Sequence, residues 1–152
     1  MRKTLPLFIV FVASLLITLN SAAQPFKRKW VDSVYNALNE QERIGQLFMV
    51  AAYSGGKNFN QKLIDRLIAN HQIGGIIFMQ GTAEEQVKLT NRYQKNAQVH
   101  LLIGMDAEWG LGMRLTGVKN FPRQMMIGAT RDTALMYEMG SAVAAQCRRL
   151  GV

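Results

Sequence analysis

The sequence predicts an α/β fold built on a parallel sheet, and three observations support this. Three apolar runs of strand length alternate with segments whose apolar residues recur at helical spacing, an order typical of parallel βα units. The runs have no polar alternation, which indicates strands buried on both faces. The chain has 152 residues, 49% hydrophobic and 18% charged, a composition typical of a globular domain and not of a disordered or collagen-like chain.

The first 23 residues have the pattern of a secretory leader. Arg2 and Lys3 precede an uncharged apolar run, and the small residues 21–23 follow at the positions that a signal peptidase recognises. The apolar run is shorter than the roughly 20 residues that a membrane-spanning helix needs. We therefore expect a signal peptide over residues 1–23, a periplasmic or secreted protein, and no stable membrane anchor after cleavage. An uncleaved anchor is the alternative.

A lead-in helix is expected ahead of the first strand. Apolar residues recur at helical spacing between Trp30 and Leu38, and we assign residues 24–37 to an N-terminal tail and lead-in helix. Asn39 and Glu42 have the spacing of a capping box, which predicts the start of a second short helix.

Three strands and two further helices are expected next along the chain. The strand candidates are the continuous apolar runs 47–52, 76–79 and 99–105. The first connecting helix carries apolar residues on one face between Leu63 and Ile68. The second begins at a capping box formed by Thr82 and Glu85.

The clearest helix runs from Arg131 to Leu150, and residues 110–122 before it are expected to form a loop. Asp132 in the first turn and Gly151 just past the end favour these helix boundaries. Cys147, the single cysteine, lies on the apolar stripe of this helix and is interpreted as a buried small hydrophobe. One cysteine excludes an intrachain disulfide and a multi-cysteine metal site.

The chain is short for the folds that this order of elements suggests. Removal of the leader leaves 129 residues, whereas a complete eightfold barrel needs about 250 residues. A helix that ends at Gly151 should be followed by another strand, so the chain looks cut there. A flavodoxin-like sheet would fit the length, but only three strands can be recognised where about five are expected.

The positive charge of the chain has simple explanations. The sequence has 18 Lys and Arg against 10 Asp and Glu, a net charge of +8, which falls to +6 when Arg2 and Lys3 leave with the leader. Much of the remaining excess lies at residues 27–29, in the tail, and at residues 148–149, where cations complement a helix C-terminus. The sequence has no glycine-rich phosphate loop and no aromatic row among lysines, so we expect no nucleic-acid partner.

The candidate functional residues follow the third strand candidate. Asp106 comes directly after it, and Glu108, Trp109 and Arg114 lie within the next eight residues. In parallel α/β sheets, ligands meet the loops at the carboxyl ends of the strands. Carboxylates accept hydrogen bonds from hydroxyl groups, arginine donates several, and an aromatic face stacks on the C–H surface of a sugar. This combination indicates a carbohydrate site.

Each of these residues also has a structural interpretation. Asp106 could cap the following segment or pair with Arg114, and Glu108 could be a structural hydrogen-bonding group instead of a catalytic acid. Trp109 could equally belong to the core. Two acids two residues apart could hold a divalent metal, but no histidine lies nearby, so we expect neither a metal nor a cofactor.

Several short blocks of the sequence occur in a characteristic order. They are LNEQERIGQL (38–47), IGGIIF (73–78), IGMDAE (103–108), RL (114–115), PRQM (122–125) and LGV (150–152). This succession resembles the N-terminal domain of family 3 glycoside hydrolases, most of all the bacterial β-N-acetylhexosaminidase branch. The resemblance implies the N-terminal part of a (β/α)8 barrel, about three βα units plus a helix. We assign residues 38–152 to this incomplete barrel domain.

The resemblance also implies a sugar subsite. In the family motif D-x-E-G-G-x-x-x-R, the aspartate and the arginine bind the sugar in the non-reducing-end subsite, and these positions are Asp106 and Arg114 here. Trp109 stands at the first glycine of the motif, a departure that bears on the loop shape and on which sugar fits. With Glu108, these residues form the expected substrate-binding set.

The implied reaction is hydrolysis of terminal β-linked N-acetylglucosamine, with retention, through a glycosyl intermediate on an aspartate. The substrate would be an amino-sugar oligosaccharide or a cell-wall fragment. The family's nucleophile, acid/base pair and lysine–histidine sugar contacts come from later strands, so we expect no catalytic residue in this chain and no activity of the chain alone. A β-glucosidase or β-xylosidase of the same family, or a non-catalytic sugar-binding or structural protein, are the alternatives.

Overall fold

The structure, a computed structural model, describes residues 25–152, and the chain divides into two compact units after Leu38. The expected signal peptide, residues 1–23, lies outside the described residues. In the first unit, helix α2 (Pro25–Ala37) occupies the segment where the sequence predicts a lead-in helix. Between residues 25 and 152, no helix combines the length and the apolar character needed to cross a membrane.

The second unit opens with a short helix, α3 (Glu40–Gly45), which begins at the predicted capping box. The Glu42 amide donates to Asn39 Oδ1 at 3.0 Å, and the Asn39 amide donates to Glu42 Oε2 at 2.8 Å. Leu47 and Phe48 form the turn after α3, because their amides donate to carbonyl groups of that helix. The first strand therefore begins two residues later than the apolar run predicts.

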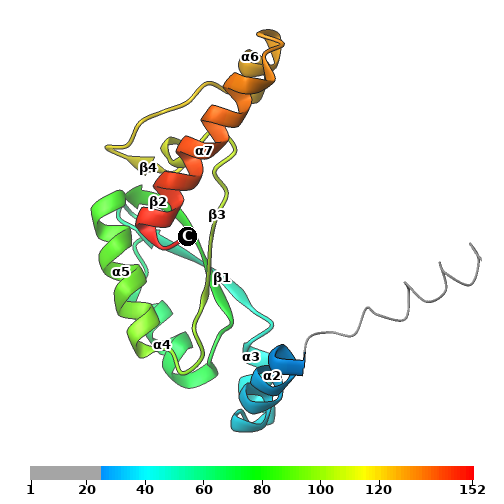
Figure 1. Ribbon diagram of the computed structural model, residues 1–152. Helices are drawn as coiled ribbons and strands as arrows, with labels where there is room; N and C mark the ends of the chain where they lie inside the picture. Colours follow the sequence, from blue (N-terminus) through cyan, green and yellow to red (C-terminus); the bar gives the residue numbers. More distant parts are fainter. Residues whose placement is uncertain (1–24) are drawn as a thin grey trace, which may run out of the picture. The chain divides into compact units, whose positions relative to one another are not determined.

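Three parallel strands form the body of a four-stranded sheet, in the order β1–β2–β3 (Figure 1). They are β1 (Met49–Ser54), β2 (Gly75–Thr82) and β3 (Leu102–Met105), connected by α4 (Gln61–His71) and α5 (Ala83–Asn96). This architecture confirms the predicted α/β class with successive parallel βα units. Of the capping box predicted for α5, the structure has one half, a bond from the Glu85 amide to Thr82 Oγ1 at 3.3 Å.

Side-chain amides bind the backbone where strand pairing stops. Gln94 donates to the Leu101 carbonyl at 2.8 Å and accepts from its amide at 3.0 Å, so β3 begins at residue 102 and not at residue 99. Asn60 does the same at the outer edge of β1. Its side chain donates to the Ala51 carbonyl at 3.0 Å and accepts from the Tyr53 amide at 3.1 Å.

The core lies between one face of the sheet and the helices α4 and α5. Its buried residues are Ala52, Ile64, Ile68, Ile73, Ile76, Phe78, Leu89, Tyr93 and Leu101. The other face is less covered, since Leu102 is 71% exposed and Met49 is 49% exposed. Burial of the strands on both faces, as the sequence predicts, is therefore incomplete within residues 39–152. In a (β/α)8 barrel the second face points into the interior, which all eight strands fill together.

The segment after β3 contains more regular structure than the sequence predicts. The expected loop 110–122 includes a 3₁₀ turn, η1 (Leu111–Met113), and a short strand, β4 (Leu115–Thr116), that pairs with the end of β2. Two helices follow, α6 (Gln124–Ala129) and α7 (Thr133–Leu150). Asp132 is the N-cap of α7, and its Oδ1 atom accepts hydrogen bonds from the amides of Ala134 and Leu135.

The C-terminal half of α7 packs on this segment. Leu150 is buried together with Leu111 and Leu115. Cys147 packs against the same cluster but is half-buried, less than the sequence predicts, and burial raises the pKa of its thiol. The helix ends at Gly151, whose φ of 74° lies in the left-handed region that glycine adopts without strain.

Candidate active-site loop

The structure places Asp106 at the carboxyl end of β3, where the sequence predicts the functional residues. The loop that follows returns to the carboxyl end of β2. The Gly81 amide donates to the Arg114 carbonyl at 3.3 Å, and β4 then pairs with Gly81 and Thr82. Both ends of the loop 106–116 are therefore fixed to the sheet (Figure 1). The pairing of this loop with the end of β2 therefore determines where Arg114 lies.

Asp106 and Arg114 form the central contact of the loop. Arg114 Nη2 donates to Asp106 Oδ2 at 2.5 Å, and Arg114 Nε donates to the Asp106 carbonyl oxygen at 3.0 Å. The Arg114 side chain is 14% exposed and that of Asp106 is 43% exposed. The pairing that the sequence left as an alternative is thus present. Asp106 Oδ1 and Arg114 Nη1 have no hydrogen-bond partner among residues 25–152, so both can still engage a ligand.

Glu108 and Trp109 lie in the same loop but have different surroundings. The Glu108 carboxylate is exposed, and its main-chain carbonyl accepts a hydrogen bond from Gln124 Nε2. The Trp109 side chain is half-buried, and the Arg123 guanidinium lies 5.0 Å from its ring centroid. A half-buried ring with a cation near its face is a different environment from a packed core.

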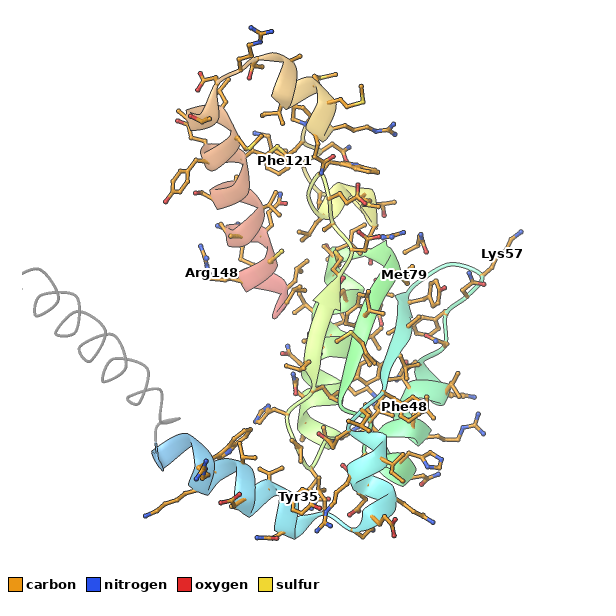
Figure 2. All side chains as sticks on the ribbon, turned by 90° about the vertical axis from the view of Figure 1, so that its right-hand side faces the viewer. Tyr35, Phe48, Lys57, Met79, Phe121 and Arg148 are labelled. Atoms are coloured by element: carbon orange, nitrogen blue, oxygen red, sulfur yellow. The ribbon has the colours of Figure 1, made fainter. Side chains whose placement is uncertain are left out.

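Gly110 has a conformation that requires glycine. Its φ of 88° and ψ of 178° fall in a region that is essentially restricted to glycine. A Cβ atom on Gly110 would lie 2.7 Å from Phe121 Cδ2 and 3.3 Å from Val143 Cγ2. The Phe121 side chain, labelled in Figure 2, therefore packs directly against the loop.

Three residues of this site carry no functional prediction from the sequence: Phe121, Arg123 and Gln124. They lie 11 to 16 positions from the loop residues that they contact, a separation at which neither helical nor strand periodicity relates two side chains. Arg123 and Gln124 do belong to the PRQM block that contributes to the family resemblance. Membership of that block is the sequence feature that could have identified Arg123 and Gln124 as candidate site residues.

Two of the cavities in the described part of the chain lie away from the Asp106–Arg114 pair. One of about 290 Å³ lies beside β4 and is lined by Thr82, Ala83, Glu84, Thr116 and Gly117. A larger cavity of about 450 Å³ lies at the opposite end of the strands, lined by Gln41, Ile44, Gly45, Phe48, Val50, Leu67, His71 and Ile73. Its apolar lining and its place at the amino ends of the strands favour a packing role. Within residues 25–152, no group of three His, Cys, Asp or Glu side chains could hold a metal ion.

Comparison with known proteins identifies a family for this arrangement. The model of the glycosyl hydrolase family 3 N-terminal domain matches residues 40–152. A β-N-acetylglucosaminidase/β-glucosidase of Cellulomonas fimi is 24% identical over 123 residues, which are 81% of this chain and 21% of that protein. A solved structure of the β-glucoside phosphorylase BglX bound to 2FGlc aligns with a TM-score of 0.68 and 20% identity over 86% of this chain and 23% of that one. The chain thus spans about a fifth of the length of these relatives.

Proposed function

Since the chain belongs to glycosyl hydrolase family 3, we propose that it supplies part of the sugar-binding subsite of a retaining glycosidase that releases terminal β-linked N-acetylglucosamine. The observation that carries this proposal is the Asp106–Arg114 pair at the carboxyl end of β3. Both residues stand at the motif positions that bind sugar in this family. The end of the sheet on which they lie is the face that carries activity in (β/α)8 enzymes.

The pair is suited to hydroxyl recognition. Asp106 Oδ1 accepts from a sugar hydroxyl, and Arg114 Nη1 donates to the neighbouring oxygen in a fixed geometry. The bond from Arg114 Nε to the Asp106 carbonyl holds the guanidinium in place before a ligand arrives. Preorganisation of this kind reduces the entropy lost on binding. Trp109, which is half-buried in the same loop, supplies an aromatic ring of the kind that packs on the C–H groups of a sugar.

The chain alone contributes binding and not bond cleavage under this proposal. A retaining mechanism needs two carboxyl-type groups about 5 Å apart on either side of the glycosidic bond. Asp106 is engaged by Arg114, and the exposed Glu108 carboxylate projects from the same loop, so neither is assigned as nucleophile or acid/base. We expect these groups in later strands of the complete protein. We also propose that this protein acts in the periplasm or outside the cell after removal of residues 1–23.

One relative supports a second candidate substrate. The Cellulomonas fimi protein is named for both β-N-acetylglucosaminidase and β-glucosidase activity. A β-glucosidase activity of the complete protein is therefore the alternative, followed by β-xylosidase activity. Binding of sugar without hydrolysis of any aryl glycoside would favour a non-catalytic sugar-binding protein.

The test uses the longest polypeptide of the reading frame that contains this chain. Asp106→Asn removes a charged acceptor, and hydrogen bonds to charged groups contribute about 1.5–3 kcal/mol, so we expect N-acetylglucosamine affinity to fall about 10- to 150-fold. Asp32→Asn, an exposed aspartate on α2, is the matched control. Hydrolysis is measured with aryl β-N-acetylglucosaminide, β-glucoside and β-xyloside. Equal sugar affinity of Asp106→Asn and Asp32→Asn would overturn the proposal.

A further inference from the structure

We propose that Arg123 and Gln124 are positioning residues for the sugar-binding loop after β3, and that Arg123 acts through Trp109. This inference rests on the proposed function, because the loop that these residues hold carries the Asp106–Arg114 pair. Neither residue lies on the strand that supplies Asp106. They stand at the start of α6, and they reach the loop with their side chains.

Three neighbouring residues hold three consecutive loop positions. Gln124 Nε2 donates to the carbonyl of Glu108, the Arg123 guanidinium lies 5.0 Å from the Trp109 ring centroid, and Phe121 fills the space beside Gly110. One segment, residues 121–124, therefore contacts the loop by a hydrogen bond, a cation–π contact and packing. The three contacts act on the backbone of residue 108, the side chain of residue 109 and the backbone of residue 110.

Helix capping does not account for an arginine at position 123. Arg123 is the N-cap of α6, a position that favours Ser, Thr, Asp or Asn because their side chains accept hydrogen bonds from the first helical amides. Arginine has no acceptor, and the Arg123 side chain makes no capping bond. A residue that departs from local preference while contacting a distant loop is typical of a position selected for a site.

The geometry also determines which part of Trp109 a ligand can use. The Arg123 guanidinium lies over the indole ring, 5.0 Å from its centroid, so a sugar cannot stack on that face while the contact is kept. Cation–π contacts at exposed sites contribute about 0.5–1 kcal/mol. Loss of Arg123 should therefore weaken sugar binding about two- to fivefold. We expect the substitution to raise KM and to leave kcat unchanged, because neither Arg123 nor Trp109 is assigned a proton-transfer or nucleophilic role.

The experiment compares Arg123→Gln with Arg66→Gln, an exposed arginine on α4, in the same long polypeptide. The protein is labelled with 5-fluorotryptophan, and the Trp109 resonance is assigned by its loss in Trp109→Phe. We expect Arg123→Gln to shift this ¹⁹F resonance and to raise KM about two- to fivefold with kcat unchanged. Arg123→Lys, which keeps the cation, should restore part of both effects. Gln124→Ala should raise KM as well, relative to Gln98→Ala.

The decisive measurement is a double-mutant cycle. If Arg123 acts through Trp109, Arg123→Gln has no further effect on KM in a Trp109→Leu background. An equal effect in both backgrounds, or an Arg123→Gln protein that matches Arg66→Gln in KM and in the ¹⁹F resonance, overturns the proposal. Unchanged sugar affinity in Asp106→Asn instead overturns the proposed function. If the proposed function fails in this way, the ¹⁹F resonance of Trp109 still tests the positioning role. A resonance that Arg123→Gln leaves unshifted overturns that role, and a resonance that Arg123→Gln shifts supports it.

Discussion

Gly110 offers the sharpest test of how the sugar-binding loop is built. Replacement of Gly110 by alanine adds a Cβ atom that would lie 2.7 Å from Phe121 Cδ2, at a φ of 88° and a ψ of 178°. The backbone strain of a non-glycine residue in this region is about 1–3 kcal/mol. Overpacking against the Phe121 ring adds about 1–3 kcal/mol. Gly110→Ala should therefore lower the free energy of unfolding by about 2–6 kcal/mol.

The assay is urea unfolding followed by circular dichroism, with Gly140→Ala as the matched control. Gly140 lies within α7, and a Cβ atom there would meet no neighbour within 4 Å. Alanine at that position should stabilise the protein by about 0.5–1 kcal/mol. In the Gly110→Ala background, Phe121→Ala should remove the overpacking cost and leave the backbone strain. The coupling free energy between the two substitutions should therefore be about 1–3 kcal/mol. A loss below about 0.5 kcal/mol for Gly110→Ala would refute the reasoning, since that is the range of inert surface changes.

Two further predictions concern stability. Asp132→Ala removes the N-cap acceptor of two α7 amides and should cost about 1 kcal/mol, measured by urea unfolding against Glu138→Ala on the same helix; equal stability of the two variants would contradict it. Burial, aided by the negative charge of Asp65, raises the pKa of Tyr93 from 10.0 to about 12. The unfolded state therefore loses its phenolic proton first, and the protein should lose stability as the pH rises from about 10 to about 12. Tyr93→Phe should flatten that part of the stability profile, whereas an unchanged slope would exclude Tyr93 as its source.

Much of the fold follows from local pattern. The capping residues Asn39 and Thr82 and the terminal Gly151 are found where the sequence predicts helix ends, because capping depends on contacts within one turn. Strand boundaries are less accessible to such reasoning. Leu47 and Phe48 are apolar like the strand that follows them, yet their amides bond back to α3.

In the candidate site, too, some features follow from the local sequence and others depend on tertiary contacts. Asp106 could be located from sequence because it ends an apolar run, and the carboxyl end of a parallel strand is a position that favours function. Its pairing with Arg114 depends on the return of the loop to β2, which the pairing of Leu115 with Gly81 fixes. The contact of Arg123 with Trp109 depends on how the start of α6 folds back, and no local periodicity encodes that.

The Asn60 side chain limits where another strand can pair with the outer edge of β1. By occupying the Ala51 carbonyl and the Tyr53 amide, it imitates the peptide group of a neighbouring strand over the carboxyl half of β1. A strand arriving from the same chain or from another molecule can therefore extend the ladder only near Met49, unless Asn60 is displaced. In a closed barrel the last strand pairs with this edge, so the Asn60 side chain limits that pairing to the amino end of β1 unless it moves away.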